Sequence, residues 1–294
     1  MSDSSIITLT NGAFDADLSP LDRGLAFGDG LFETCRVRAG QVPLWLLHAR
    51  RLRSGAERLG IPLDEERLER ERDQLLEAAS GQSGVLKLIL TRGQGGRAYQ
   101  PPAHPAPSLC WQFRPGEPPS WEAGQTGVTL YQCRHRLGDN PALAGMKHLN
   151  RLEYVLARSE WGNDYPEGLL LDGEGRVVEG TLSNVFVRLE EGWRTPRLER
   201  NGVAGVMRQL LLDSLAPAQE IAVTEAAISV EELMTAREWF VCNSVFGLWP
   251  VVGLAPEGAH WPVGEQTRQL QRAFDSWLEG RSTTKSMIMT TTGE

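Results

Sequence analysis

Lys147 is the residue of this sequence whose type and position best suit covalent chemistry. It stands at the mouth of an apolar segment in which Leu149, Leu152 and Leu156 recur at helical spacing, which predicts a helix with a buried stripe after the lysine. Partial desolvation at such a junction lowers the pKa of a lysine and favours Schiff-base formation. Most lysines are solvated surface groups. Considered alone, Lys147 is therefore either a reactive amine or an ordinary surface lysine.

Arg51 is the arginine most clearly directed inward by the sequence pattern. In a helix over residues 44–59, the face that holds His48, Arg51, Leu52 and Leu59 is the apolar one. A buried guanidinium needs an anion, because burying it unpaired costs several kcal/mol. That anion is either a phosphate, which the guanidinium fork fits well, or a carboxylate of the protein itself.

Glu179 and the segment 201–208 are two further candidates for a binding site. Glu179 ends a predicted strand, 176–179, where a carboxylate is directed into a cleft or lies exposed at a sheet edge. The segment 201–208 carries two glycines before a predicted helix over 209–215. Free N–H groups at a helix start suit a phosphate, although a plain glycine N-cap explains the same pattern.

These residues together match the requirements of one cofactor. An amine for a Schiff base, a carboxylate for a pyridine nitrogen, an inward arginine and a glycine-started helix for a phosphate are the groups that pyridoxal 5'-phosphate requires. The glycine-rich loop 91–102 carries Arg92 and Arg97 and would admit an anionic substrate, or it is simply a surface loop.

The elements that must position these residues are strands and helices in mixed order. Asn11-Gly12 predicts an N-terminal hairpin, and the glycine-rich run 24–30 predicts a tight loop that enters a strand over 31–37. A helix is expected over 65–79. The other predicted strands are 85–90, 109–113, 127–133, 168–172, 176–179, 185–187 and 239–242.

The domain organisation follows from the strong break at 115–120, Pro-Gly-Glu-Pro-Pro-Ser. We predict an α/β protein with a smaller N-terminal α+β domain, residues 1–116, a linker, 117–126, and a larger mixed α/β domain, residues 127–280, with the cofactor between the domains. The Ser/Thr-rich end, 281–294, is expected to be disordered. A chain of 294 residues is long enough for two cores.

Composition excludes several classes of function. The formal net charge of -8, without a basic tail, argues against nucleic-acid binding. The N-terminus does not resemble a signal peptide, and long uncharged apolar runs are absent from the sequence. We therefore expect a soluble cytoplasmic protein that does not bind membranes. The four cysteines and five histidines are dispersed, so no metal site is expected.

Four motifs, in order and spacing, closely resemble the fold-type IV pyridoxal-phosphate enzymes, a family of branched-chain aminotransferases, D-amino acid aminotransferases and 4-amino-4-deoxychorismate lyase. The resemblance extends from Ala13 to Val251, and the run after Lys147 is most similar to the lyase branch. The motifs are Gly28-Asp29-Gly30-Leu31-Phe32-Glu33-Thr34, His48-x-x-Arg51-Leu52, Lys147-x-Leu149-Asn150-Arg151-Leu152-Glu153 and Glu179-Gly180-x-x-Ser183-Asn184-x-Phe186.

The resemblance implies a role for each candidate residue. Lys147 would bind the cofactor covalently and then act as the proton-transfer base, and Glu179 would pair with the pyridine nitrogen. The implied phosphate partners are Arg51, the backbone N–H groups of Val206 and Met207, and the hydroxyl of Ser244. Related aminotransferases have threonine at that last position, so the role of Ser244 rests on a weaker match. Tyr154 does not align with the tyrosine that aminotransferases place after the lysine and is left unassigned.

The activity implied by the resemblance is cleavage of 4-amino-4-deoxychorismate to 4-aminobenzoate and pyruvate, a step of folate biosynthesis, in a homodimer. Arg92, Arg97 and His148 are the candidate hosts for the two substrate carboxylates. Two alternatives stay open. One is a branched-chain or D-amino acid aminotransferase on the same scaffold, and the other is a binding or scaffold protein that keeps the fold without the cofactor.

Overall fold

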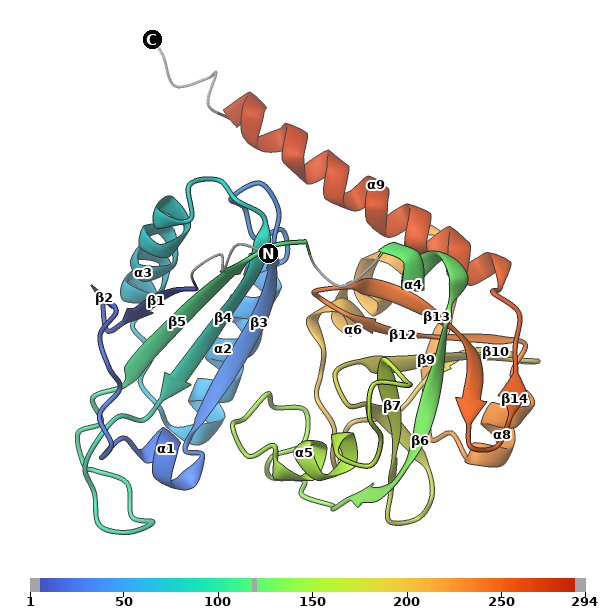
Figure 1. Ribbon diagram of the computed structural model, residues 1–294, viewed down its shortest axis with the longest axis horizontal. Coiled ribbons are helices and arrows are strands. Elements are labelled where there is room, and N and C mark those ends of the chain that lie inside the picture. The colour runs from blue at the N-terminus through green and yellow to red at the C-terminus, as the bar shows by residue number, and fades with distance from the viewer. Residues whose placement is uncertain (1–5, 118–120, 289–294) are drawn as a thin grey trace. The chain divides into compact units, whose positions relative to one another are not determined.

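The structure is a computed structural model that describes residues 6–117 and 121–288, and its chain forms two compact units (Figure 1). Unit 1 comprises Met1–Pro119 and Gly145–Leu152, and unit 2 comprises Ser120–Ala144 and Glu153–Glu294. The expected domain 127–280 is thus interrupted, because the short segment around Lys147 pairs with a strand of unit 1. Part of the expected linker, 117–126, is helical.

Unit 1 is built on a five-stranded antiparallel sheet in the order β2-β1-β5-β4-β3. Side chains alternate between buried and half-buried along its strands, as expected for a sheet with one covered face. The predicted N-terminal hairpin is confirmed as the β1–β2 pair. The strands are β1 (Ile7–Thr10), β2 (Ala13–Phe14), β3 (Gly30–Val37), β4 (Gly84–Thr91) and β5 (Ser108–Pro115).

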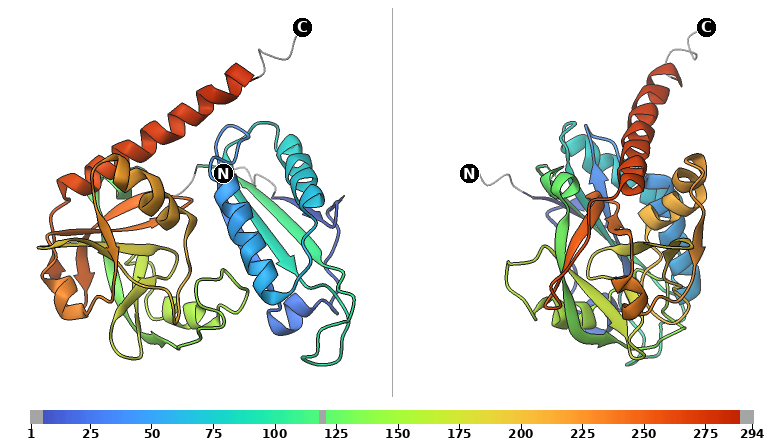
Figure 2. Two further views of the ribbon diagram at one scale, coloured as in Figure 1. Left: turned by 180° about the vertical axis from the view of Figure 1, so that it is seen from behind. Right: turned by 90° about the vertical axis from the view of Figure 1, so that its right-hand side faces the viewer.

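Two helices, α2 (Trp45–Leu59) and α3 (Glu65–Ala78), cover one face of this sheet (Figure 2). The buried side of α2 includes His48 and Leu52, so the predicted inward face is confirmed. Gly60 ends α2 at a positive φ of 63°, a conformation that glycine adopts without steric cost. The short helix α1 (Arg23–Phe27) precedes β3.

Unit 2 is built on a nine-stranded mixed sheet in the order β11-β10-β9-β12-β13-β6-β7-β8, with β14 paired to β13. One core receives side chains from β7 and from β9, which are distant in this order, so the sheet curls around its core (Figure 1). The strands are β6 (Val128–Leu137), β7 (Glu167–Asp172), β8 (Val177–Gly180), β9 (Asn184–Leu189), β10 (Gly192–Thr195), β11 (Val223–Glu225), β12 (Glu238–Asn243), β13 (Gly247–Ala255) and β14 (Ala259–His260).

The remaining helices are mostly short connections. They are α4 (Trp121–Thr126), α5 (Leu152–Arg158), α6 (Val206–Leu210), the π-helical turn η1 (Leu211–Leu215), α7 (Ala216–Ala218), α8 (Val230–Met234) and α9 (Glu265–Ile288). Among the described residues, none of these helices is long and apolar enough to cross a membrane.

The C-terminal helix α9 differs from the sequence expectation. Residues 281–288, expected to be disordered, continue the helix, whereas 289–294 lie outside the described residues. The physical reason is that adding turns to a helix already anchored by buried Leu270, Phe274 and Leu278 avoids the cost of a new nucleus.

The helix after Lys147 also differs from its prediction. It begins at Leu152, and Leu152 and Leu156 are 69% and 50% exposed rather than buried. Ala157 lies on its inward face instead. The delay arises because the backbone around Lys147 is extended and pairs with β3, which is incompatible with helical geometry.

Candidate active site

The Lys147 segment is held against β3 by the backbone. The Phe32 N–H donates to the Lys147 carbonyl at 3.0 Å, and the Leu149 N–H donates to the Gly30 carbonyl at 3.0 Å. The half-buried Lys147 places its Nζ 4.4 Å from the centroid of the Phe32 ring, a cation–π contact. The lysines of the sequence are Lys87, Lys147 and Lys285, so few amines compete for a covalent role.

Arg51 lies in the same unit and contacts a buried carboxylate of the protein. Its Nε donates to Glu33 Oε1 at 2.8 Å, and its Nη2 donates to Oε2. His48 Nδ1 lies 2.6 Å from the same Glu33 Oε2. Glu33 is 1% exposed because it occupies a core-facing position of β3 between Leu31 and Cys35. The internal-carboxylate alternative is therefore observed, and a phosphate role for Arg51 stays a prediction.

The charges of this cluster are set by its burial and contacts. Burial alone would raise the pKa of the Glu33 carboxyl, but the Arg51 guanidinium and the His48 hydrogen bond hold that pKa at about 2. Burial lowers the pKa of His48, so at neutral pH its imidazole is neutral and Nδ1–H donates to Glu33. The charge of Lys147 acts on His48 in the same direction, which places the lysine within electrostatic reach of the cluster.

We expect the substitution Glu33→Gln to lower the free energy of unfolding by about 1.5 to 3 kcal/mol, because it removes the buried charge to which Arg51 and His48 are hydrogen-bonded. The pKa of Glu33 is lowered on folding from 4.5 to about 2, so its stabilisation is present above pH 4.5 and is lost as the pH falls towards 2. Urea unfolding at pH 7 and pH 3 measures both effects, and E33Q should lose less stability on acidification than the wild type.

The matched control for this prediction is Glu65→Gln, which removes a carboxylate of α3 that pairs with an arginine of α2. Arg53 makes the same two-point contact with Glu65, at 2.6 Å from both Nε and Nη2, but both side chains are exposed. Exposed pairs add little to stability, so E65Q should unfold like the wild type. Equal effects of E33Q and E65Q would contradict the assignment of Glu33 as a buried counter-charge.

Arg92, a predicted substrate residue, is 6% exposed and engaged within unit 1. Its Nε donates to Asp29 Oδ2 at 2.8 Å, and its other nitrogens donate to the carbonyls of Leu59 and Gly60 at 2.7 and 2.9 Å. Burial raises the pKa of the Asp29 carboxyl, but Arg92 and Arg23 outweigh this effect and lower it.

Arg23 supports the glycine-rich loop on which Arg97 lies. It shares Asp29 with Arg92 and donates to the carbonyls of Ala98 and Tyr99 at 2.8 and 3.2 Å. Arg97 itself is exposed and pairs through its backbone with Gln100. The loop is thus fixed from inside while the Arg97 side chain projects outward.

His148, the third predicted substrate residue, is half-buried beside β3, where it bridges to Leu31. Burial and the nearby Arg151 lower its pKa to about 4. At neutral pH the imidazole is therefore uncharged and offers a hydrogen bond rather than a positive charge to a carboxylate.

Glu179 is the third residue of β8 in unit 2 and is 2% exposed, so the edge-exposed alternative is excluded. Its Oε2 accepts hydrogen bonds from Val203 N–H at 2.9 Å and Asn184 Nδ2 at 3.2 Å. Its Oε1 accepts from the Tyr154 hydroxyl at 2.5 Å. These three donors carry no charge.

A second buried carboxylate, Glu167, fixes the turn that follows Glu179. Its Oε1 accepts from the Thr181 N–H at 2.9 Å and its Oε2 from the Ser183 hydroxyl at 2.7 Å. A Cβ at Gly180 would lie 2.2 Å from Ser183 Oγ, so only glycine fits this turn. The turn therefore fixes the direction in which the chain continues from Glu179 into β9.

The predicted phosphate-binding residues of unit 2 lie at a helix start and a turn. Val206 and Met207 form the first turn of α6, where Gly205 is the N-cap and provides no side-chain hydrogen bond. A Cβ at Gly205 would lie 2.0 Å from Asn184 Oδ1. Ser244 follows β12 in a turn closed by Asn243, whose Oδ1 accepts from Val245 N–H at 2.9 Å.

These groups fit pyridoxal phosphate by the chemistry of their donors. Glu179 offers a buried carboxylate to a protonated ring nitrogen, and the three donors described for it are neutral. The N-cap of α6 is kept small by its contact with Asn184. Sequence reasoning missed Glu33, Tyr154 and Asn184 as partners of the site residues. A signal existed for Glu33, since a glutamate on the apolar side of an alternating strand requires a partner.

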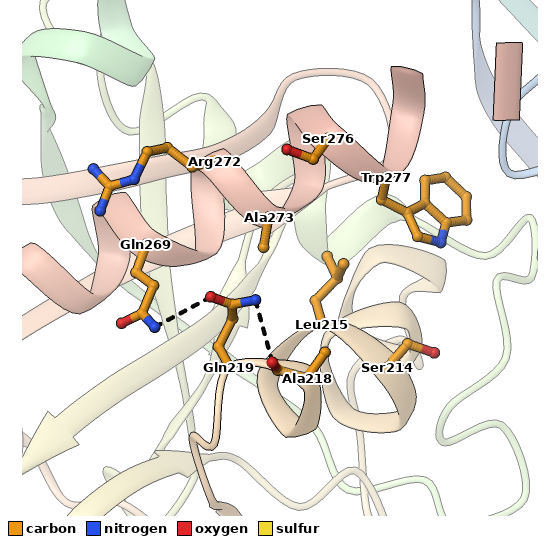
Figure 3. A pocket seen from close by; sticks show the side chains of 9 residues that line it. All are labelled: Ser214, Leu215, Ala218, Gln219, Gln269, Arg272, Ala273, Ser276 and Trp277. Carbon is orange, nitrogen blue, oxygen red and sulfur yellow. Dashed lines mark hydrogen bonds between the residues drawn. The ribbon is translucent and has the colours of Figure 1, made fainter. Parts of the chain in front are cut away.

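A separate pocket of about 520 Å³ in unit 2 does not contain the predicted site residues (Figure 3). Its lining is formed by Ser214, Leu215, Ala218, Gln219, Gln269, Arg272, Ala273, Ser276 and Trp277. Gln269 and Gln219 are joined by a hydrogen bond of 3.1 Å. The charged side chain of this lining, Arg272, donates to Glu265 at 2.8 Å, so the pocket offers no comparable set of catalytic groups.

Comparison with known proteins places the chain in a family. Residues 30–254 match the family model described as amino-transferase class IV, and the chain therefore belongs to this family. The crystal structure of 4-amino-4-deoxychorismate lyase from Pseudomonas aeruginosa is similar, with 49% sequence identity and a TM-score of 0.84. The match covers 90% of this chain and 97% of that one. The expected fold-type IV architecture is thus confirmed.

Two named relatives are similar in sequence over most of their length. The aminodeoxychorismate lyase of Vibrio harveyi is 36% identical over 266 residues, which cover 85% of this chain and 93% of that protein. A putative branched-chain-amino-acid aminotransferase of Methanocaldococcus jannaschii is 30% identical over 272 residues, 90% of this chain and 93% of that protein.

Proposed function

We propose that this protein is a pyridoxal-phosphate-dependent lyase that converts 4-amino-4-deoxychorismate to 4-aminobenzoate and pyruvate, a step of folate biosynthesis. The observation that carries the proposal is the 49% identity to the lyase from Pseudomonas aeruginosa over 90% of this chain. The groups described above supply the charges and the amine that this chemistry requires.

The proposed site residues have distinct roles. Bound pyridoxal phosphate supplies an aldehyde for covalent attachment and a ring that withdraws electrons from the reacting carbon. Lys147 provides the amine for that attachment, and Glu179 keeps the ring nitrogen protonated. Arg51 binds the phosphate, assisted by the residues at the start of α6 and by Ser244.

The reaction itself asks two things of the protein. As a free amine, Lys147 would remove the proton from the substrate carbon that bears the amine. The bond between the neighbouring ring carbon and the enolpyruvyl oxygen would then break, so that the ring becomes aromatic. The group would leave as enolpyruvate, which takes up a proton to become pyruvate. Aromatisation makes the step effectively irreversible, and no keto-acid acceptor is consumed.

Arg97 is the best supported of the three proposed substrate hosts. Its side chain is exposed on a loop that Arg23 holds in place, so the charge is available at small conformational cost. Arg92 is engaged by Asp29, and His148 is neutral at pH 7. We propose that Arg92 supports the loop and that His148 contributes at most a hydrogen bond.

The test is pyruvate release from 4-amino-4-deoxychorismate by the cofactor-loaded protein without any keto acid. We expect turnover together with formation of 4-aminobenzoate. Turnover that requires a keto-acid acceptor would instead establish an aminotransferase, the second candidate, which the 30% identity to the Methanocaldococcus jannaschii protein supports.

The proposal extends to assembly and location. Leu152, Val155 and Leu156 of α5 are 69%, 60% and 50% exposed. Their spacing places them on one helix face, and an exposed apolar face of this kind favours a homodimer, which sedimentation would measure. Four cysteines with free thiols are typical of a reducing compartment, in agreement with a cytoplasmic enzyme.

A further inference from the structure

The two oxygens of Glu179 are held by different parts of unit 2. Oε2 accepts from Val203 N–H and from Asn184 Nδ2. These two donors are themselves coupled, because the same Asn184 Nδ2 donates to the Val203 carbonyl at 2.8 Å. Oε2 is therefore anchored by the backbone after Gly202, whose φ of +78° makes that turn possible.

Oε1 depends on a side chain from another element. Its donor is the hydroxyl of Tyr154 on α5, at 2.5 Å. A carboxylate anchored at one oxygen still rotates about that contact, so the second contact fixes its plane. Tyr154 consequently helps to orient the Glu179 carboxylate.

Tyr154 is itself firmly placed. Its half-buried ring packs against a core cluster that includes Ala157, Trp161 and Val178. Val178 precedes Glu179 in β8, so the donor and the acceptor are positioned by the same core. A tyrosine has few rotatable bonds, and little conformational freedom is lost when its hydroxyl is held at one point.

The chemical type of this donor matters as well. An arginine or lysine at Oε1 would neutralise the carboxylate and weaken its attraction for a cationic ring. A phenol satisfies a buried oxygen without bringing a positive charge. The contact therefore orients the anion and leaves its charge available.

We propose that Tyr154 is a positioning residue that acts on the cofactor's ring nitrogen through Glu179. This inference rests on the proposed function, in which Glu179 faces that nitrogen. Tyr154 is not proposed as a catalytic residue. Its effect on cofactor binding is confined to interactions that involve the ring nitrogen.

The experiment compares two cofactors on the full-length protein. Dissociation constants are measured by absorbance titration for pyridoxal phosphate and for its 1-deaza analogue, in which carbon replaces the ring nitrogen. We expect Tyr154→Phe to weaken pyridoxal phosphate binding roughly tenfold, as for a lost hydrogen bond to a charged group, and to change binding of the analogue less than about twofold. In the double variant with Glu179→Gln, the Y154F effect should largely disappear.

Tyr165→Phe is the matched control. Tyr165 packs against the same cluster, 5.8 Å from Tyr131 between ring centroids, and should leave both affinities unchanged. Equal losses for both cofactors in Y154F, or effects of Y154F and E179Q that simply add, would overturn the inference while leaving the role of Glu179 intact. If E179Q binds both cofactors as the wild type does, the proposed role of Glu179 fails and the inference fails with it.

Discussion

Substitution of Lys147 by alanine should abolish covalent binding of the cofactor and lower turnover by at least roughly a thousandfold, within the range for loss of a positioned acid-base group. The reason is that, in the proposed function, one amine serves both for attachment and for proton removal. Borohydride reduction followed by peptide mass spectrometry should locate the modification on Lys147 in the wild type and show none in K147A.

Lys87 provides the matched control for this prediction. Its Nζ lies 5.6 Å from the centroid of the Phe32 ring, the ring that Lys147 contacts at 4.4 Å. Lys87 has no role in the proposed site, so Lys87→Ala should retain the visible absorption band and the pyruvate release of the wild type. A reduced cofactor found on Lys87, or full activity of K147A, would refute the proposed site, and absence of any bound cofactor in the wild type would favour the scaffold alternative.

Substitution of Glu179 by glutamine should lower the turnover number roughly a hundredfold, an effect typical of removing one preorganised electrostatic group. Glutamine keeps the shape of the side chain but not its charge, so under the proposed function the ring nitrogen would lose the anion that holds its proton. Steady-state pyruvate release with saturating cofactor measures the effect, which we expect in kcat more than in KM.

Glu238→Gln separates this loss from a general loss of stability. Glu238 is another buried carboxylate of unit 2, 2% exposed, and it accepts hydrogen bonds from Arg188 at 2.8 Å and from Thr267 N–H at 2.9 Å. E238Q should unfold more easily while its turnover number at low temperature stays near that of the wild type. Comparable losses of turnover in E179Q and E238Q would show that Glu179 acts through stability alone.

Part of the candidate site could be predicted from the sequence because its signals are local. Helical periodicity placed His48 and Leu52 on the buried side of α2, which the structure confirms, and Arg51 is half-buried beside them. The same reasoning failed after Lys147, where leucines at helical spacing predicted a buried stripe. There, a nonlocal backbone pairing with β3 delays the helix and leaves Leu152 and Leu156 exposed.

The hydrogen-bond partners of the site residues could not be predicted from local sequence patterns. Glu33 and Arg51 are joined across a strand and a helix, and Tyr154 reaches Glu179 from α5 to β8. Each contact depends on packing between elements that are separated in sequence. Arg92 shows the same effect, because Asp29 and two backbone carbonyls engage a side chain that composition alone suggested for the substrate.

By itself the sequence determined the family, the mixed α/β architecture and the residue types from which the chemistry is proposed, because motif spacing and hydrophobic periodicity are properties of the local chain. The tertiary structure alone decided which buried charges are paired, which arginine is held inside the protein, and which hydroxyl orients Glu179. Those outcomes depend on distances between distant segments, and such distances are fixed only when the two sheets and their helices have packed.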